Sequence, residues 1–184
     1  MSSQDHIPWA SPMNPKSSSQ FEIVRESDVP IADSELRDIL NQVYVEAGFT
    51  EPVRAETLFA PAAVRARGQL LHARNAEGDL LGIVILVRPH SGGRRFAQPD
   101  ECELHLLATL PKARRTGVGT ALVKTALARA SSEGYRKAIL WTQPPMLSAQ
   151  RLYQSVGFVR VPERDFTQAD QVFLFMERDQ LTAM

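Results

Sequence analysis

Cysteine is almost absent from this chain of 184 residues, and its single copy is Cys102. One cysteine excludes an intrachain disulfide bond and a cluster of thiolate metal ligands. The four histidines are scattered, with no pair at the spacing of metal ligands, so we expect no metal site. These shortages exclude a disulfide scaffold and argue against a metalloenzyme.

The chain also lacks a net charge, because Lys plus Arg and Asp plus Glu both number 21. Proteins that bind nucleic acids usually carry an excess of positive charge, so we expect no nucleic-acid partner. No apolar run has the length of about 20 residues that spans a membrane, and the N-terminus lacks the plan of a signal peptide. We therefore expect a cytoplasmic protein, monomeric or homodimeric, with no membrane partner.

Residues 1–19 lack apolar periodicity and contain three prolines and a run of three serines at 17–19. Such a composition is typical of a disordered tail. The remainder, residues 20–184, has the length of one domain and is long enough to bury a core. Apolar residues make up 43% and charged residues 23% of the chain, as in ordinary globular proteins. We expect one domain behind an N-terminal tail.

Hydrophobic periodicity predicts an α/β fold, with helices and strands alternating along the second half. Helices are predicted from Asp33 to Gly48, around residues 62–64, and over 117–132 and 146–156. Strands are predicted over 21–25, 69–74, 80–88, 101–109, 136–141, 158–161 and 172–177. A helix lies between the strands 101–109 and 136–141, so these two should be parallel within a sheet that is otherwise antiparallel.

The stretch from Glu103 to Val123, ELHLLATLPKARRTGVGTALV, joins a strand to a helix through a basic turn that contains glycine. The N-terminus of a helix presents free N–H groups and the positive end of its dipole, and together these bind anions. Arg114 and Arg115 add donors that carry charge, and glycine lets the backbone approach a phosphate. The string fits neither a dinucleotide fingerprint nor a P-loop. Close packing of the helix on the sheet would explain the glycines equally well.

The stretch from Glu103 to Val123, with its lead-in from Leu107 to Pro111, is followed by a second motif, A-x-x-L-Y-x-x-x-G-F, from Ala149 to Phe158. In this order the two resemble the first and second motifs of the GNAT superfamily of N-acetyltransferases. The resemblance covers about residues 20–178. It implies a mixed sheet of six or seven strands with about four helices, in which the central parallel strands splay apart near a bulge.

The resemblance also implies acetyl-CoA as co-substrate, without a metal. The backbone of Leu107 and Thr109 would bind the pantetheine arm like an added strand. The pyrophosphate would be bound by the side chain of Arg114 and by the N–H groups of Arg115, Thr116, Gly117, Val118, Gly119 and Thr120. Met146 stands where many members carry an asparagine, and Thr142 or Ser148 would have to replace its contact to the cofactor.

The same resemblance implies Tyr153 as the general acid that protonates the departing thiolate. A phenol with a pKa near 10 is protonated at neutral pH, as this role requires. Helical periodicity equally explains Tyr153 as a buried apolar residue. When the strand is aligned with the family by its Leu-Ala pair and Pro111, Glu103 stands where several members carry a glutamate that deprotonates the amine. The resemblance therefore makes Glu103 the candidate base, and His105 is a second candidate on the same strand face.

These residues predict acetyl transfer from acetyl-CoA to a primary amine of a small molecule or peptide. The alternative is a catalytically silent sensor that binds acyl-CoA and regulates a partner. Several arginines, Arg54, Arg65, Arg67, Arg94 and Arg95, could favour an acidic acceptor or could be ordinary surface charge.

Overall fold

A computed structural model describes residues 20–181, and the tail predicted over residues 1–19 lies outside the described residues. The α-helices are α1 (Asp33–Leu40), α2 (Pro52–Leu58), α3 (Pro61–Arg65), α4 (Val118–Ser132) and α5 (Leu147–Ser155). The strands are β1 (Phe21–Arg25), β2 (Gln69–Asn75), β3 (Leu80–Val87), β4 (Glu101–Thr109), β5 (Lys137–Thr142), β6 (Val159–Arg160), β7 (Phe166–Gln168) and β8 (Gln171–Arg178). Within residues 20–181, no helix is long and apolar enough to cross a membrane.

The strands form one mixed sheet in the order β1-β2-β3-β4-β5-β8-β6, and β7 pairs with β8 beside this path. The β4–β5 pair is parallel, as predicted, and the other pairs are antiparallel. The α/β fold is confirmed, and β7 adds an eighth strand to the expected six or seven. β7 has only three residues in the connection before β8, which is too short for a periodic signal.

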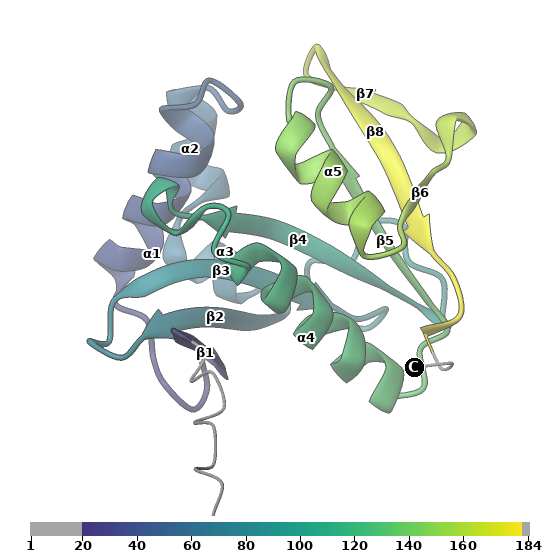
Figure 1. Cartoon of the computed structure of the whole chain (residues 1–184). Coiled ribbons are helices and arrows are strands. Elements are labelled where there is room, and N and C mark those ends of the chain that lie inside the picture. Colours follow the sequence, from purple (N-terminus) through teal and green to yellow (C-terminus); the bar gives the residue numbers. More distant parts are fainter. Residues whose placement is uncertain (1–19, 182–184) are drawn as a thin grey trace, which may run out of the picture.

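Helices cover both faces of the sheet (Figure 1). The core between the sheet and α4 contains α4 residues at helical spacing, Val118, Leu122, Val123, Ala126 and Leu127. The core on the opposite face contains Leu36, Ile39 and Leu40 of α1 together with Ile83, Ile85 and Val87 of β3. β3 lies between the two cores and is buried on both faces, as its continuous apolar run predicted.

The parallel strands β4 and β5 pair only over their first residues, Glu101 to Glu103 of β4. Beyond this point they diverge, and Figure 1 shows β5 rising away from β4 toward α5. β4 contains a bulge here, because Ile85 and Ile83 of β3 oppose His105 and Ala108. Leu106 within the bulge has a φ of 49°. The extra residue bends the strand away from β5, and the expected splay is therefore present.

The helical segment before β2 differs from the prediction. α1 ends at Leu40 and continues as the single π-helical turn η1 (Asn41–Val45). The one helix expected around residues 62–64 is preceded by another, and each of α2 and α3 begins with a proline. Pro61 separates them because its ring excludes the preceding helical turn and removes an N–H donor.

Candidate active site

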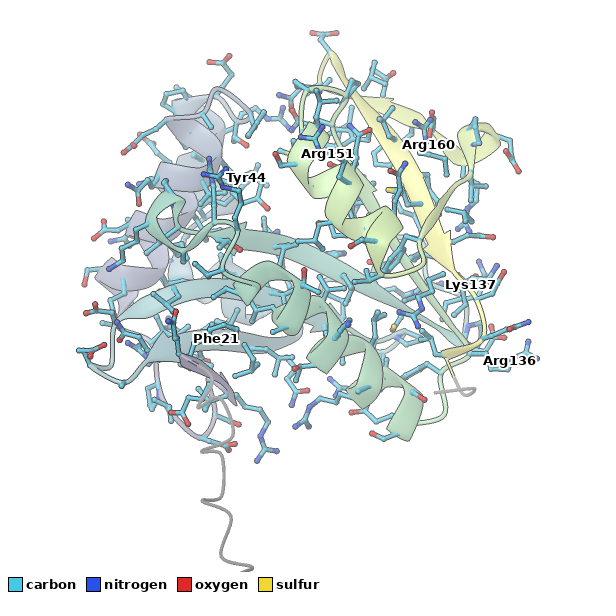
Figure 2. The ribbon with its side chains drawn as sticks, viewed as in Figure 1. Phe21, Tyr44, Arg136, Lys137, Arg151 and Arg160 are labelled. Carbon is cyan, nitrogen blue, oxygen red and sulfur yellow. The ribbon has the colours of Figure 1, made fainter. Side chains whose placement is uncertain are left out.

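A cavity of about 1180 Å³ opens where β4 and β5 diverge. Its walls come from η1, α2, the loop before β4, the turn before α4, α5 and the β7–β8 hairpin. Tyr44 of η1 and Arg151 of α5 line it from opposite sides (Figure 2). Segments far apart in the sequence therefore meet at one site.

The N-terminus of α4 forms one end of this cavity. Gly117 caps the helix with a φ of 90°, a left-handed conformation that favours glycine, and it makes no side-chain capping bond. The first hydrogen bond of the helix runs from the N–H of Ala121 to the carbonyl of Gly117. The N–H groups of Val118, Gly119 and Thr120 therefore have no partner within the helix. Free N–H groups at a helix N-terminus are able to bind an anion.

The residues predicted for this anion site do not all contribute in the same way. The cavity is lined by Arg114, Arg115, Gly117, Gly119 and Thr120. The side chain of Val118 is buried in the core instead, and Thr116 donates its hydroxyl to the carbonyl of Ala113 at 2.7 Å. The side chains of these two residues do not line the cavity, so only their backbone groups are available to an anion there.

Gly119 is needed for close packing at this end. A Cβ atom there would lie 2.9 Å from Leu152 Cδ1 and 3.2 Å from Thr109 Oγ1. Close packing therefore explains this glycine, as the sequence allowed. The glycine brings the start of α4 against α5 and β4, and so fixes the position of the free N–H groups.

The free edge of β4 forms the floor of the cavity. The N–H of Leu110 donates to the carbonyl of Leu81 on β3. Backbone groups alternate along a strand, so those of Leu107 and Thr109 point away from β3, into the gap that β5 leaves. The hydroxyl of Tyr44 already donates to the carbonyl of Leu107 at 2.8 Å. This edge can accept an extended ligand as an additional strand.

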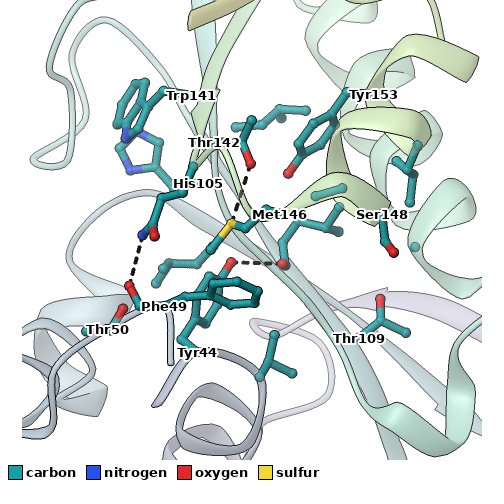
Figure 3. A pocket seen from close by; sticks show the side chains of 18 of the residues that line it. Tyr44, Phe49, Thr50, His105, Thr109, Trp141, Thr142, Met146, Ser148 and Tyr153 are labelled. Atoms are coloured by element: carbon teal, nitrogen blue, oxygen red, sulfur yellow. Dashed lines mark hydrogen bonds between the residues drawn. The ribbon is translucent and has the colours of Figure 1, made fainter. Parts of the chain in front are cut away.

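Tyr153 lies on α5 with its hydroxyl pointing into the cavity beside Thr142 and Met146 (Figure 3). Its side chain is only 8% exposed and packs edge-on against Phe158 at 5.8 Å between ring centroids. Burial raises the pKa of Tyr153, so the phenol keeps its proton at neutral pH. Within residues 20–181 its hydroxyl makes no hydrogen bond.

Thr142 is buried and lines the same cavity, and its hydroxyl contacts Met146 Sδ at 3.4 Å (Figure 3). Ser148 lines the cavity as well. Two hydroxyl groups thus lie close to the place where the asparagine was expected.

Glu103 is fully buried beneath the cavity and does not line it. Its Oε1 accepts hydrogen bonds from the backbone N–H groups of Arg95, Phe96 and Ala97 at 3.0, 2.5 and 2.6 Å. Burial is the largest influence and would raise its pKa, but the hydrogen bonds from His105 and from these N–H groups outweigh it and lower the pKa. Glu103 is therefore a carboxylate at neutral pH with both oxygens engaged.

His105 connects this carboxylate to the cavity. Its Nε2 lies 2.7 Å from Glu103 Oε2, and its ring packs edge-on against Trp141 at 4.8 Å between centroids. A carboxylate at Nε2 favours the tautomer with the proton on Nε2, which leaves Nδ1 free to accept a proton. Burial lowers the pKa of His105, against the opposite influence of Glu103, so the ring is neutral near pH 7.

Tyr44 is a residue of the site that the sequence did not reveal. Its spacing from Val43 and Leu40 is that of a buried helix face, which was its predicted role. The π-helical turn instead directs its hydroxyl to Leu107 at the cavity, and such turns are frequent at functional sites. Burial raises the pKa of Tyr44.

Within residues 20–181 no group of three or more His, Cys, Asp or Glu side chains is placed to hold a metal ion. Cys102 is buried on the face of β4 that packs against α4, where burial raises the pKa of its thiol to about 12.

Comparison with known proteins supplies the family. The model of the acetyltransferase (GNAT) family matches residues 34–158. An uncharacterised N-acetyltransferase of Schizosaccharomyces pombe is 36% identical over 91 residues, which is 50% of this chain and 52% of that protein. The chain thus matches about half the length of that curated relative.

Solved structures share the fold. An acetyltransferase of the GNAT family from Staphylococcus aureus superposes with a TM-score of 0.67 at 17% identity, covering 86% of this chain and 98% of the other. A Bacillus subtilis acetyltransferase, solved in complex with CoA, gives 0.61 at 17% identity with the same coverage. At such identities the superpositions show the fold alone.

Proposed function

The chain belongs to the acetyltransferase (GNAT) family, and we propose that it moves the acetyl group of acetyl-CoA directly to a primary amine of a small molecule or peptide. One observation carries this proposal. The free N–H groups of α4, the free edge of β4, a buried phenol and a histidine paired with a carboxylate all meet at a single cavity.

The residues present fit acetyl-CoA. The N–H groups of Val118, Gly119 and Thr120, with the side chains of Arg114 and Arg115, would hold the pyrophosphate. The open space around Gly117, where a Cβ would meet no atom within 4 Å, leaves room for that group. The backbone of Leu107 and Thr109 would bind the pantetheine arm.

When bound, acetyl-CoA supplies a thioester whose C–S bond breaks as the amine nitrogen forms the new C–N bond. Backbone N–H groups near Thr109 would stabilise the negative charge that develops on the carbonyl oxygen. The rest of the chemistry is proton transfer, for which this chain offers one base and one acid.

His105 is the better placed of the two candidate bases. It lines the cavity and has Nδ1 free, whereas Glu103 is buried and uses both oxygens in hydrogen bonds. We therefore assign proton removal from the amine to His105 Nδ1, and assign Glu103 the role of holding the ring and its tautomer. This pairing follows the logic of a histidine oriented by a buried carboxylate.

Tyr153 would act as the acid. Its hydroxyl faces the cavity without a hydrogen-bond partner in the described part of the chain, and burial raises its pKa. The phenol therefore holds its proton until a stronger base, the departing thiolate, lies beside it.

The release of CoA thiol, measured with a panel of primary amines, tests this function. We expect release that depends on the amine, together with a product of the mass of the N-acetylated amine. Stabilisation of the protein by acetyl-CoA without release for any amine would instead favour the acyl-CoA sensor. No stabilisation and no release would contradict both functions.

A further inference from the structure

Besides Arg114 and Arg115 at the start of α4 and Arg151 of α5, the cavity is lined by three further arginines: Arg54, Arg67 and Arg95. They come from α2, from the turn after α3 and from the loop before β4. Two other arginines of these segments have partners elsewhere. Arg65 pairs with Glu26 and Asp33, and Arg94 donates to the carbonyl of Ala97.

The protein leaves the charge of these three arginines uncancelled. In residues 20–181 none of the three forms an ion pair, and no Asp or Glu lines the cavity. Arg54 donates to Gln171 Oε1 at 3.0 Å and Arg95 to Gln168 Oε1 at 2.9 Å. Both glutamines belong to the β7–β8 hairpin, where a glutamate would have neutralised the guanidinium. An amide holds the guanidinium in place and keeps its charge available.

Arg67 and Arg95 are also held by their surroundings. Arg67 is half-buried and donates to the carbonyl of Leu58 at 2.7 Å. The guanidinium of Arg95 lies over the rings of Phe96, Trp141 and Phe166, at 5.0 to 5.3 Å from their centroids. Arg95 is exposed but held over the three rings, and Arg67 is half-buried. Cations that are held in place beside a cavity lose less side-chain freedom on binding an anion than mobile surface charges do.

Arg95 lies close to the candidate base, and Arg67 lines the same cavity. Burial is the main reason that the pKa of His105 is lowered, and the charges of Arg67 and Arg95 lower it further. Arg95 and His105 contact the same indole ring, that of Trp141. An anion bound by these arginines would therefore lie near the ring of His105, the candidate base.

We propose that the acceptor is a primary amine that also carries a carboxylate, as an amino acid does, and that Arg67 and Arg95 bind this carboxylate beside His105. Arg54 adds positive charge to the same cavity. A planar guanidinium matches the geometry of a carboxylate, with two parallel hydrogen bonds. A diamine or polyamine would find no counter-charge among the described residues of this cavity.

The inference rests on the proposed function but is tested without turnover. Calorimetry on the CoA-loaded protein compares N-acetyl-leucine and N-acetylphenylalanine with their primary amides, which lack the charge. We expect each acid to bind roughly 10-fold to 100-fold more tightly than its amide, the range of a hydrogen bond to a charged group. Equal binding of acid and amide would overturn the proposal.

Substitutions identify the residues. Arg67→Gln and Arg95→Gln should each remove most of the difference between acid and amide. Arg37→Gln should leave it unchanged, because Arg37 is an exposed residue of α1 outside the cavity. Thermal unfolding of each variant shows whether it is folded, and Arg95 serves as the second variant if Arg67→Gln is not. A difference that survives in the Arg95 variant would contradict the assignment.

The two proposals fail separately. Release of CoA with amines, but without preference for amino acids over their amides, leaves the acetyltransferase standing and refutes the carboxylate site. Tight binding of N-acetyl acids without CoA release for any amine supports the carboxylate site and refutes the transferase.

Discussion

The pairing of Glu103 with His105 gives the sharpest prediction, through the substitution Glu103→Gln. Oε1 accepts N–H groups of Phe96 and Ala97, so the carbonyl oxygen of the glutamine must take that place. The amide NH2 then takes the place of Oε2 and donates to His105 Nε2. This donation forces the ring proton onto Nδ1, the atom that would accept a proton from the amine.

The expected loss of activity follows from the value of a general base, about 10²-fold to 10⁴-fold. We expect kcat/KM to fall by about 10²-fold or more, with the acetyl-CoA dissociation constant unchanged. Loss of the charged acceptor also weakens hydrogen bonds to buried N–H groups, at a cost to the free energy of unfolding of about 1–3 kcal/mol. The variant should therefore fold and bind cofactor while turning over slowly.

The pH profile separates this role from a merely structural one. The base must be neutral, and the pKa of His105 is below its ordinary value near 6.5. Wild-type kcat/KM should therefore rise with pH below about 6.5 and be level near neutrality. Without the carboxylate, which raises the pKa of His105, the rising limb should shift to lower pH.

Glu101→Gln is the matched control. Like Glu103, Glu101 lies on β4, is buried and accepts a backbone N–H, that of Gln98 at 3.0 Å. Within the described residues, only Glu103 of the two is hydrogen-bonded to His105. Substitution of Glu101 should leave kcat/KM within a few-fold of wild type. If Glu103→Gln behaves like Glu101→Gln in both rate and pH profile, the assigned role of Glu103 is wrong.

Three further predictions concern the acid, the cofactor and stability. Tyr153→Phe should lower kcat about 10²-fold with an unchanged calorimetric affinity for acetyl-CoA, and full turnover would refute the acid role. Gly119→Val places a Cβ 2.9 Å from Leu152 and so disturbs the start of α4. Steady-state kinetics should then show a KM for acetyl-CoA at least about 10-fold higher. An unchanged KM in a folded variant would count against cofactor binding at the N-terminus of α4. Burial lowers the pKa of His72 and His105, so the unfolded chain binds protons first as the pH falls below about 6.5. Urea unfolding at pH 7.5 and 5.5 should show lower stability at the lower pH, and equal stability would contradict these shifts.

The family, the alternation of elements and the parallel pair could be predicted, because each leaves a pattern in consecutive residues. Val118, Leu122 and Val123 repeat at helical spacing and follow glycines at the start of α4, so the helix and its N-terminus were both visible. Pro61 was equally visible, yet its consequence, the separation of α2 from α3, was missed.

The acceptor half of the site could not be predicted, because it depends on contacts between distant segments. The roles that we propose for Glu103 and His105 depend on the loop at residues 95–97, whose N–H groups donate to the carboxylate of Glu103. Strand parity placed both side chains on one face but could not say which of them reaches the cavity. Likewise, no local pattern shows that Arg67 and Arg95 line the cavity while Arg65 and Arg94 have partners elsewhere. That difference follows from ion pairs and hydrogen bonds across the fold.

A crystal structure with CoA and an N-acetylated amino acid bound together tests the central claim most directly. The account predicts the pyrophosphate within hydrogen-bond distance of the N–H groups of Val118, Gly119 and Thr120. It also predicts the acetylated nitrogen beside His105 Nδ1 and the carboxylate on Arg67 and Arg95. A pyrophosphate bound away from α4, or a product amide distant from His105, would contradict it.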